Sequence, residues 1–73
     1  MQTLVFNTTT KSVKLYESQS ENSSILFTAD NVPTVKMIDG YYEVMQIIQT
    51  ESTEARVPIA RFPIAATNML IKK

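Results

Sequence analysis

Residues Val32–Gln46 read V-P-T-V-K-M-I-D-G-Y-Y-E-V-M-Q, and this stretch decides the fold class. Two runs of alternating apolar and polar residues flank Asp39-Gly40, and Gly40 is the only glycine in the chain. An Asp-Gly pair between alternating runs is typical of a β-hairpin with a type I′ turn. That turn needs positive φ at both central residues, which glycine and aspartate tolerate best. The stretch therefore predicts a hairpin, and with it a small all-β protein.

A two-residue turn also fixes which residues of the two strands face each other. The predicted cross-strand pairs are Ile38 with Tyr41, Met37 with Tyr42, Lys36 with Glu43, and Val35 with Val44. Because side chains alternate between the faces of a strand, one face is apolar and is expected to line the core. It carries Val35, Met37, Tyr42 and Val44. The opposite face carries Thr34, Lys36, Ile38, Tyr41, Glu43 and Met45. On that face Lys36 and Glu43 are expected to pair across the strands.

Length and composition exclude several classes of protein. The 73 residues correspond to a single domain, 1–73. Seven basic and seven acidic residues cancel, whereas a general nucleic-acid-binding protein needs a clustered excess of Lys and Arg. No run approaches the ~18 apolar residues of a membrane span, and the N-terminus lacks the pattern of a signal peptide. We therefore expect a cytoplasmic protein with no direct nucleic-acid or membrane contact.

The rest of the chain also shows the residue patterns of short strands. Apolar runs or alternation predict strands at Gln2–Asn7, Ser12–Tyr16, Ile25–Thr28, Tyr41–Ile48, Ala55–Ile59 and Asn68–Ile71, besides the strand before Asp39. The polar stretches Glu17–Ser24 and Gln49–Glu54 are expected to be loops. Because Pro58 and Pro63 interrupt regular pairing, Ile59–Ile64 is expected to form an edge or a 3₁₀ crossover. Five to six short antiparallel strands that close on themselves would leave no exposed edge, which favours a small barrel.

Residue types that carry catalysis are scarce. The chain has no histidine and no cysteine, so it lacks the usual base for a serine or cysteine nucleophile and the usual ligands for zinc. Two pairs of carboxylates, Glu17/Glu21 and Glu51/Glu54, lie in polar loops without the apolar surroundings that would favour acid catalysis. A single glycine cannot build a phosphate-binding loop. We expect no enzymatic activity, no cofactor and no metal.

Candidate binding residues are therefore those suited to contact with another protein. Tyr and Arg are enriched at interface hot spots. Tyr16, Tyr41, Arg56 and Arg61, together with Lys14, could therefore form a binding patch. The alternative is that these side chains only cover the ends of the barrel. Phe6, Phe27 and Phe62 are expected in the core. Phe62 also belongs to the segment Val57–Ile64, which either packs as a crossover or presents an apolar surface to a partner. The acidic loop Glu51–Glu54 is either a solvated tip or a contact for a basic partner.

The order of these segments resembles the SH3-like barrels, especially the bacterial ones. The matching segments are S-V-K-L-Y, the Ser-rich loop E-S-Q-S-E-N-S-S, I-L-F-T, T-V-K-M-I, the turn D-G, Y-Y-E-V-M, V-P-I-A-R-F and N-M-L-I, which together span Ser12–Ile71. The chain departs from the pattern at Pro33, where a glycine is usual, and it has no Gly-Trp-Val before the crossover. This resemblance implies an SH3-like barrel and, as one function, binding of bacterial cell-wall peptides.

In size and character the chain is also similar to the small host-takeover proteins of bacteriophages, among them the RNA-polymerase-binding transcription regulators of Xanthomonas phages. That resemblance implies a non-enzymatic, phage-encoded protein. It would bind subunits of host RNA polymerase, inhibit transcription initiation and promote antitermination. We take this as the leading hypothesis and cell-wall binding as its alternative. A structural subunit of a larger assembly and a nucleic-acid role follow as third and fourth hypotheses.

Overall fold

The computed structural model describes all residues 1–73 and contains seven strands and one short 3₁₀ helix. The elements are β1 (Gln2–Asn7), β2 (Ser12–Tyr16), β3 (Ile25–Ala29), β4 (Val35–Ile38), β5 (Tyr41–Gln49), β6 (Glu54–Pro63), η1 (Ile64–Ala66) and β7 (Thr67–Lys72). The prediction of an all-β protein is therefore confirmed. No helix of the length and apolarity needed to cross a bilayer is present.

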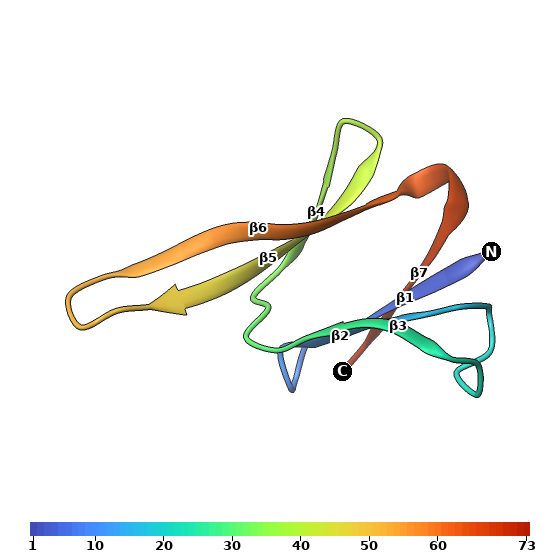
Figure 1. Ribbon diagram of the computed structural model, residues 1–73, viewed down its shortest axis with the longest axis horizontal. Helices are drawn as coiled ribbons and strands as arrows, with labels where there is room; N and C mark the ends of the chain where they lie inside the picture. The colour runs from blue at the N-terminus through green and yellow to red at the C-terminus, as the bar shows by residue number, and fades with distance from the viewer.

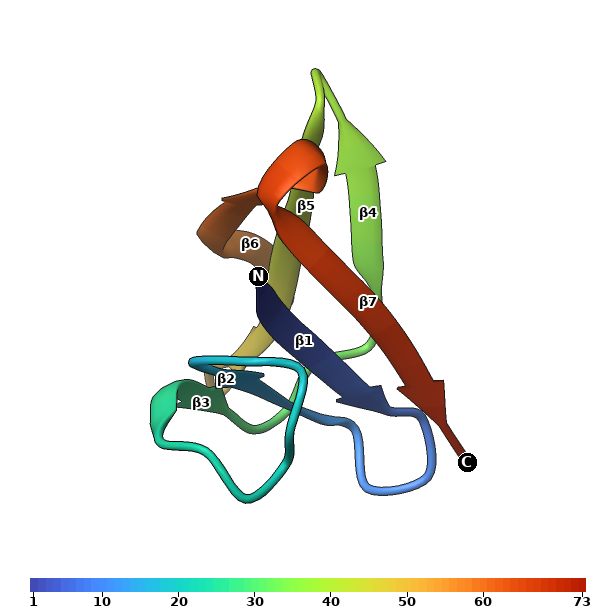
Figure 2. The ribbon, with the colours of Figure 1, turned by 90° about the vertical axis from the view of Figure 1, so that its right-hand side faces the viewer.

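The strands form two sheets, whereas the sequence predicted a closed barrel (Figures 1 and 2). One sheet has four strands in the order β3-β2-β1-β7, and the other has three in the order β4-β5-β6. The prediction of closure is wrong because neither β7 nor β3 pairs with a strand of the second sheet. The prediction of purely antiparallel pairing is also wrong, since β7 runs parallel to β1. Alternation predicts strands but not their partners or directions.

The hairpin around Asp39-Gly40 has the predicted register. Val35, Lys36, Met37 and Ile38 of β4 face Val44, Glu43, Tyr42 and Tyr41 of β5. Asp39 and Gly40 both have positive φ, 52° and 79°, as a type I′ turn requires. The backbone N–H of Ile64 donates to the carbonyl of Gly40 at 2.9 Å, so the chain that follows β6 also holds this turn.

The core lies between the two sheets. The four-stranded sheet contributes Leu4, Phe6, Val13 and Leu15, while Val44 comes from β5 and Val32 from the connection between β3 and β4. Partly buried side chains that complete the core are Phe27, Ala29, Val35, Tyr42, Ala60, Phe62 and Met69. The prediction that Phe6, Phe27 and Phe62 belong to the core is confirmed. Phe27 and Phe62 join the two sheets through an edge-to-face contact with ring centroids 5.5 Å apart.

The predicted apolar face of the hairpin is only partly correct. Val35, Tyr42 and Val44 pack in or against the core, but Met37 is 74% exposed because β4 extends beyond the edge of the four-stranded sheet. On the opposite face, Glu43 and Met45 are buried. Both belong to β5, which is the central strand of its sheet and has neighbours on each side.

The segment around Pro58 and Pro63 is an edge strand, which was one of the two predicted alternatives. β6 continues to Pro63, and a register shift between Val44 and Met45 accommodates an extra residue on β6 near Ile59. The 3₁₀ turn comes after this segment, at Ile64–Ala66, and leads the chain to β7 in the other sheet. The 3₁₀ crossover is therefore present, but it begins at Ile64, the last residue of the predicted range.

The end of the β5–β6 hairpin extends well beyond the region where the two sheets pack against each other (Figure 1). The last backbone link from this hairpin to the rest of the molecule runs from the N–H of Ile47 to the carbonyl of Asn31, at 2.8 Å. Beyond it, all residues from Ile48 to Arg56 are exposed. We call Ile48–Ala55 the arm. It gives the molecule its long axis of 40 Å, against 26 and 20 Å in the other directions.

Candidate protein-interaction face

The outer face of the β4–β5–β6 sheet is the surface that points away from the core. The register places Ile38, Tyr41 and Pro63 side by side in a first row next to the Asp39-Gly40 turn. The second row holds Lys36, Glu43 and Arg61, and the following rows pair Met45 with Pro58 and Ile47 with Arg56. The face therefore has an apolar end, a charged centre and a basic margin toward the arm.

The charged centre depends on Glu43. This residue is only 6% exposed, and its Oε2 accepts a hydrogen bond from Nε of Arg61 at 2.6 Å. The Arg61 side chain is half exposed, so the guanidinium lies on the surface while a buried carboxylate fixes one edge of it. An arginine held in this way loses less conformational freedom when it binds a carboxylate of a partner. Lys36 faces Glu43 across the strands as predicted, but the ion pair of Glu43 is with Arg61, on the strand at its other side.

The remaining charges on this face have no partner of their own. The two ion pairs of the structure are Glu43–Arg61 and Glu21–Lys72, so neither Lys36 nor Arg56 takes part in one. Lys36 lies in the same row as Arg61, and Arg56 lies nearer the arm. The outer face therefore combines three cationic side chains with one carboxylate that is buried beneath Arg61.

Three of the five predicted binding residues come together on this face, namely Tyr41, Arg56 and Arg61. Tyr41 is 40% exposed, which leaves much of its ring available. Lys36, Ile38 and Ile59 were not among the predicted binding residues, although they lie near Tyr41 and Arg61 on the same three-stranded sheet. The first two share the face of Tyr41 in the predicted register, so the hairpin pattern alone contained that signal. Ile59 lies near the bulge of β6, which no sequence pattern revealed.

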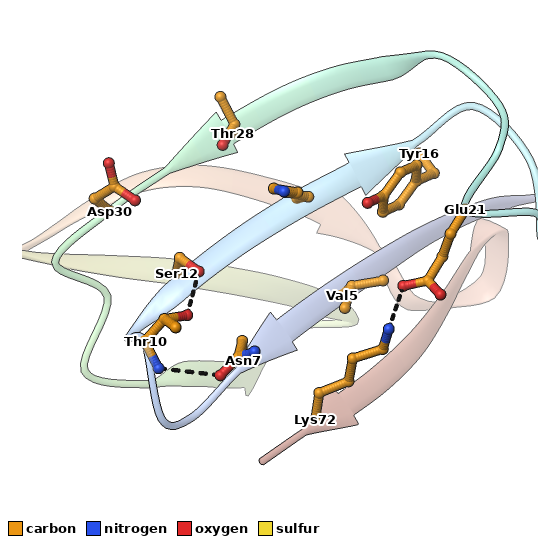
Figure 3. Close-up of a pocket in the computed structure, with 10 residues that line it drawn as sticks. Val5, Asn7, Thr10, Ser12, Tyr16, Glu21, Thr28, Asp30 and Lys72 are labelled. Atoms are coloured by element: carbon orange, nitrogen blue, oxygen red, sulfur yellow. Dashed lines mark hydrogen bonds and ion pairs between the residues drawn. The ribbon is translucent and has the colours of Figure 1, made fainter.

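The other two predicted binding residues, Tyr16 and Phe62, do not lie on this face. Phe62 is on the inner face of β6 and packs against Phe27. Tyr16 is buried on the outer face of the other sheet. The loop Glu17–Ser24 reaches across that sheet, and Glu21 of this loop forms a 2.6 Å ion pair with Lys72 of β7 (Figure 3). This strap covers the outward-facing side chains beneath it, which explains why Tyr16 and Val5 are both buried.

Beside this strap lies a polar pocket of about 380 Å³ (Figure 3). Its lining comes from the strap, from β1, β2, β3 and β7, and from the turns after β1 and β3: Val5, Asn7, Thr10, Ser12, Lys14, Tyr16, Glu21, Thr28, Asp30 and Lys72. Lys14 is exposed and has no ion-pair partner. The Oδ1 atom of Asn7 accepts from the backbone N–H groups of Thr9 and Thr10, both at 3.0 Å, so it is already engaged. The pocket offers an amine, a carboxylate and hydroxyl groups to a ligand, and only two of its ten lining residues are hydrophobic.

The structure contains no group of three or more His, Cys, Asp or Glu side chains placed to hold a metal ion. Fold and surface together define a small all-β domain made of two packed sheets, with a basic and partly apolar outer face on one of them. Comparison of the chain with protein-family models, curated proteins and solved structures gives no match.

Proposed function

We propose that this protein is a non-enzymatic regulator that binds another protein through the outer face of the β4–β5–β6 sheet. The observation that carries this proposal is the row formed by Lys36, Glu43 and Arg61 beside the exposed Tyr41. Tyrosine and arginine supply much of the binding energy in protein interfaces. A fixed arginine next to an aromatic ring is suited to a partner surface that combines carboxylates with apolar side chains.

For the partner we propose a bacterial RNA polymerase, with the protein encoded by a phage and acting in the host cytoplasm. The support is the resemblance in size and character to the small polymerase-binding regulators of Xanthomonas phages. A stable interface of ordinary size covers ~800 Å² on each partner. The whole chain exposes 4798 Å², so such a contact would occupy a large share of one side of the molecule. The regulator then acts by covering or wedging the polymerase surface, which inhibits initiation and promotes antitermination.

Retention of purified Xanthomonas RNA polymerase on the immobilised chain tests this proposal. We compare the wild type with two charge reversals of equal size, Arg56→Glu on the outer face and Lys14→Glu on the four-stranded sheet. Both residues are exposed and neither is in an ion pair, so both variants are expected to fold. The proposal predicts strong retention by the wild type and Lys14→Glu and at least tenfold weaker retention by Arg56→Glu. Failure of the wild type to retain polymerase, or equal loss in both variants, would contradict it.

The polar pocket favours a second candidate, an SH3-like module that binds bacterial cell-wall peptides. Such peptides carry free amine and carboxylate groups, and the pocket presents Lys14 and Asp30 to match them. Sedimentation with purified cell walls tests this candidate. It predicts that the wild type cosediments and that Lys14→Glu does not, while Arg56→Glu behaves as the wild type. The same two variants thus separate the two functions.

A further inference from the structure

The two sheets end in four edge strands, β3, β7, β4 and β6, and unpaired edges tend to bind other strands unless something blocks them. β6 is blocked. The bonds Ile64 N–H to Gly40 O and Thr50 N–H to Thr53 O fix which residues of β6 point toward β5. By alternation, Pro58 and Pro63 fall at positions that point away from it. Proline has no N–H, so it removes two donors from this edge, and the bulge near Ile59 interrupts it further.

Two other edges are short. β4 has four residues and follows Pro33, while β3 has five and is irregularly paired near Tyr16. Neither offers a long regular row of backbone donors and acceptors. Short and irregular edges are a common way to avoid pairing with other chains.

β7 has none of these protections. Its six residues, T-N-M-L-I-K, contain neither proline nor glycine, and its register with β1 has no irregularity. The carbonyl of Lys72 accepts from the backbone N–H of Thr8 at 2.8 Å, so the even-numbered residues of β7 point toward β1. The odd-numbered residues, Thr67, Met69 and Ile71, therefore direct their backbone groups away from the sheet. Figure 2 shows β7 lying along β1.

The side chains along this edge are also apolar and exposed. Leu70 points to the outer face of the sheet and is 41% exposed, and Ile71 points to the inner face and is 62% exposed. A long, regular edge strand that exposes apolar side chains on both faces is the kind of edge that proteins usually protect against pairing with another chain.

We propose that β7 pairs antiparallel with β7 of a second copy of this chain, which joins the two four-stranded sheets into one. The register that satisfies the outward backbone groups places Met69 opposite Ile71 of the other copy, as a hydrogen-bonded pair. Leu70 then lies opposite its own counterpart at the twofold axis, as a non-hydrogen-bonded pair. Asn68 faces Lys72 of the other copy.

The partner is a second copy because the strand is complementary to itself in this register. Apolar residues meet apolar residues on both faces, and no like charges lie opposite each other. Lys72 is already neutralised by Glu21 within its own chain and faces an amide across the interface. A contact of one strand pair belongs to the small class below ~1,200 Å² in total, so the association is weak and depends on concentration.

Oxidative cross-linking through a single introduced cysteine tests the pairing, because the chain has no cysteine of its own. Leu70→Cys places two cysteines opposite each other at a Cα separation of ~4.5 Å, which a disulfide can bridge. Asn68→Cys is the matched control on the same strand and face, where the two cysteines lie ~13 Å apart along the strands. Met37→Cys is the control for random collision at a more exposed site. We expect a covalent dimer from Leu70→Cys and at least tenfold less from either control.

Sedimentation velocity over a range of concentrations provides the second test. Ile71→Pro removes a backbone N–H that points away from β1, so the hydrogen bonds between β7 and β1 remain. Ile71→Val keeps this N–H and serves as the control. The proposal predicts that the wild type and Ile71→Val associate as concentration rises and that Ile71→Pro remains monomeric. Equal cross-linking of all three cysteine variants, or a wild type that stays monomeric throughout, overturns it. A monomeric wild type whose polymerase retention is lost in Ile71→Pro would assign this edge to the other protein instead.

Discussion

Glu43 shows how a single residue organises the surface of this small protein. The carboxylate of Glu43 is buried on the central strand, and it accepts a hydrogen bond from Nε of Arg61. This bond offsets the cost of burying the carboxylate, and it also holds the exposed guanidinium in place. A buried charge needs such a partner, because an unpaired one retains its full desolvation cost. The same contact therefore serves stability and the proposed function at once.

Replacing Arg61 tests this role. Arg61→Ala leaves the buried carboxylate without its bond, and we expect a loss of about 1–3 kcal/mol in the free energy of unfolding. Arg56→Ala is the matched control, since Arg56 is exposed on the same strand and has no ion pair; its effect is expected within about 0.5 kcal/mol. Urea unfolding of the two variants measures the difference. Equal stabilities would mean that Glu43 is satisfied without Arg61.

Residue patterns predicted some of these features and not others. The Asp39-Gly40 turn and the pairing on either side of it follow from local chemistry, and the structure confirms them. The partner of Glu43 could not be predicted, because Arg61 lies on a third strand whose register depends on a bulge. The burial of Tyr16 was equally hidden, since it results from a polar loop that is tied to the far strand by Glu21.

At the scale of elements, the β5–β6 hairpin divides into a packed part and the arm. The packed part is bound to the segment between β3 and β4, with Met45 N–H donating to Thr34 O and Ile47 N–H to Asn31 O. The side-chain amide of Gln46 adds a bond to the carbonyl of Asp30 at 2.9 Å. The arm has no comparable support, and an isolated two-stranded ribbon is only marginally stable in water.

Amide hydrogen exchange is expected to reveal this division. The amides of Ile48–Ala55 should exchange with little protection, while those of Leu4, Leu15 and Val44 should approach the protection of global unfolding. The physical reason is that the arm can open without exposing any core residue. Protection of the arm equal to that of the core would contradict its description as a separate, weakly held element.

The sequence predicted strands where apolar runs or alternation were clear, but it did not predict which strands pair. Strands β1, β2, β3 and β5 were predicted close to their observed bounds. The parallel pairing of β1 with β7 joins the two ends of the chain, and no local signal encodes it. The absence of a closed barrel has the same origin, because closure depends on which edges meet.

At the scale of the whole molecule, the core is small. Only 12 of 73 residues are buried, so the packing of one sheet on the other must supply much of the stability. The contact of Phe27 with Phe62 is the clearest link between the sheets, because the first belongs to β3 and the second to β6. Its geometry, with an interplanar angle of 64°, is the favourable edge-to-face arrangement.

A double-mutant cycle measures this link. Phe27→Leu and Phe62→Leu are expected to show a coupling of about 0.5–1.5 kcal/mol in the free energy of unfolding. Phe27→Leu combined with Met69→Leu is the control, because β3 and β7 lie at opposite edges of their sheet. That pair should be additive within about 0.5 kcal/mol. Additivity of the two phenylalanine variants would mean that the sheets are not packed through this contact.

The proposed function requires that the outer face of the β4–β5–β6 sheet be the surface that binds a partner. Line broadening of the backbone amide signals of the ¹⁵N-labelled protein, on addition of a small molar fraction of Xanthomonas RNA polymerase, tests this directly. We predict selective broadening at Ile38, Tyr41, Arg56 and Arg61, with the signals of Lys14 and Thr28 largely unchanged. Broadening centred on Lys14 and Thr28, or no broadening at all, would contradict the proposed function.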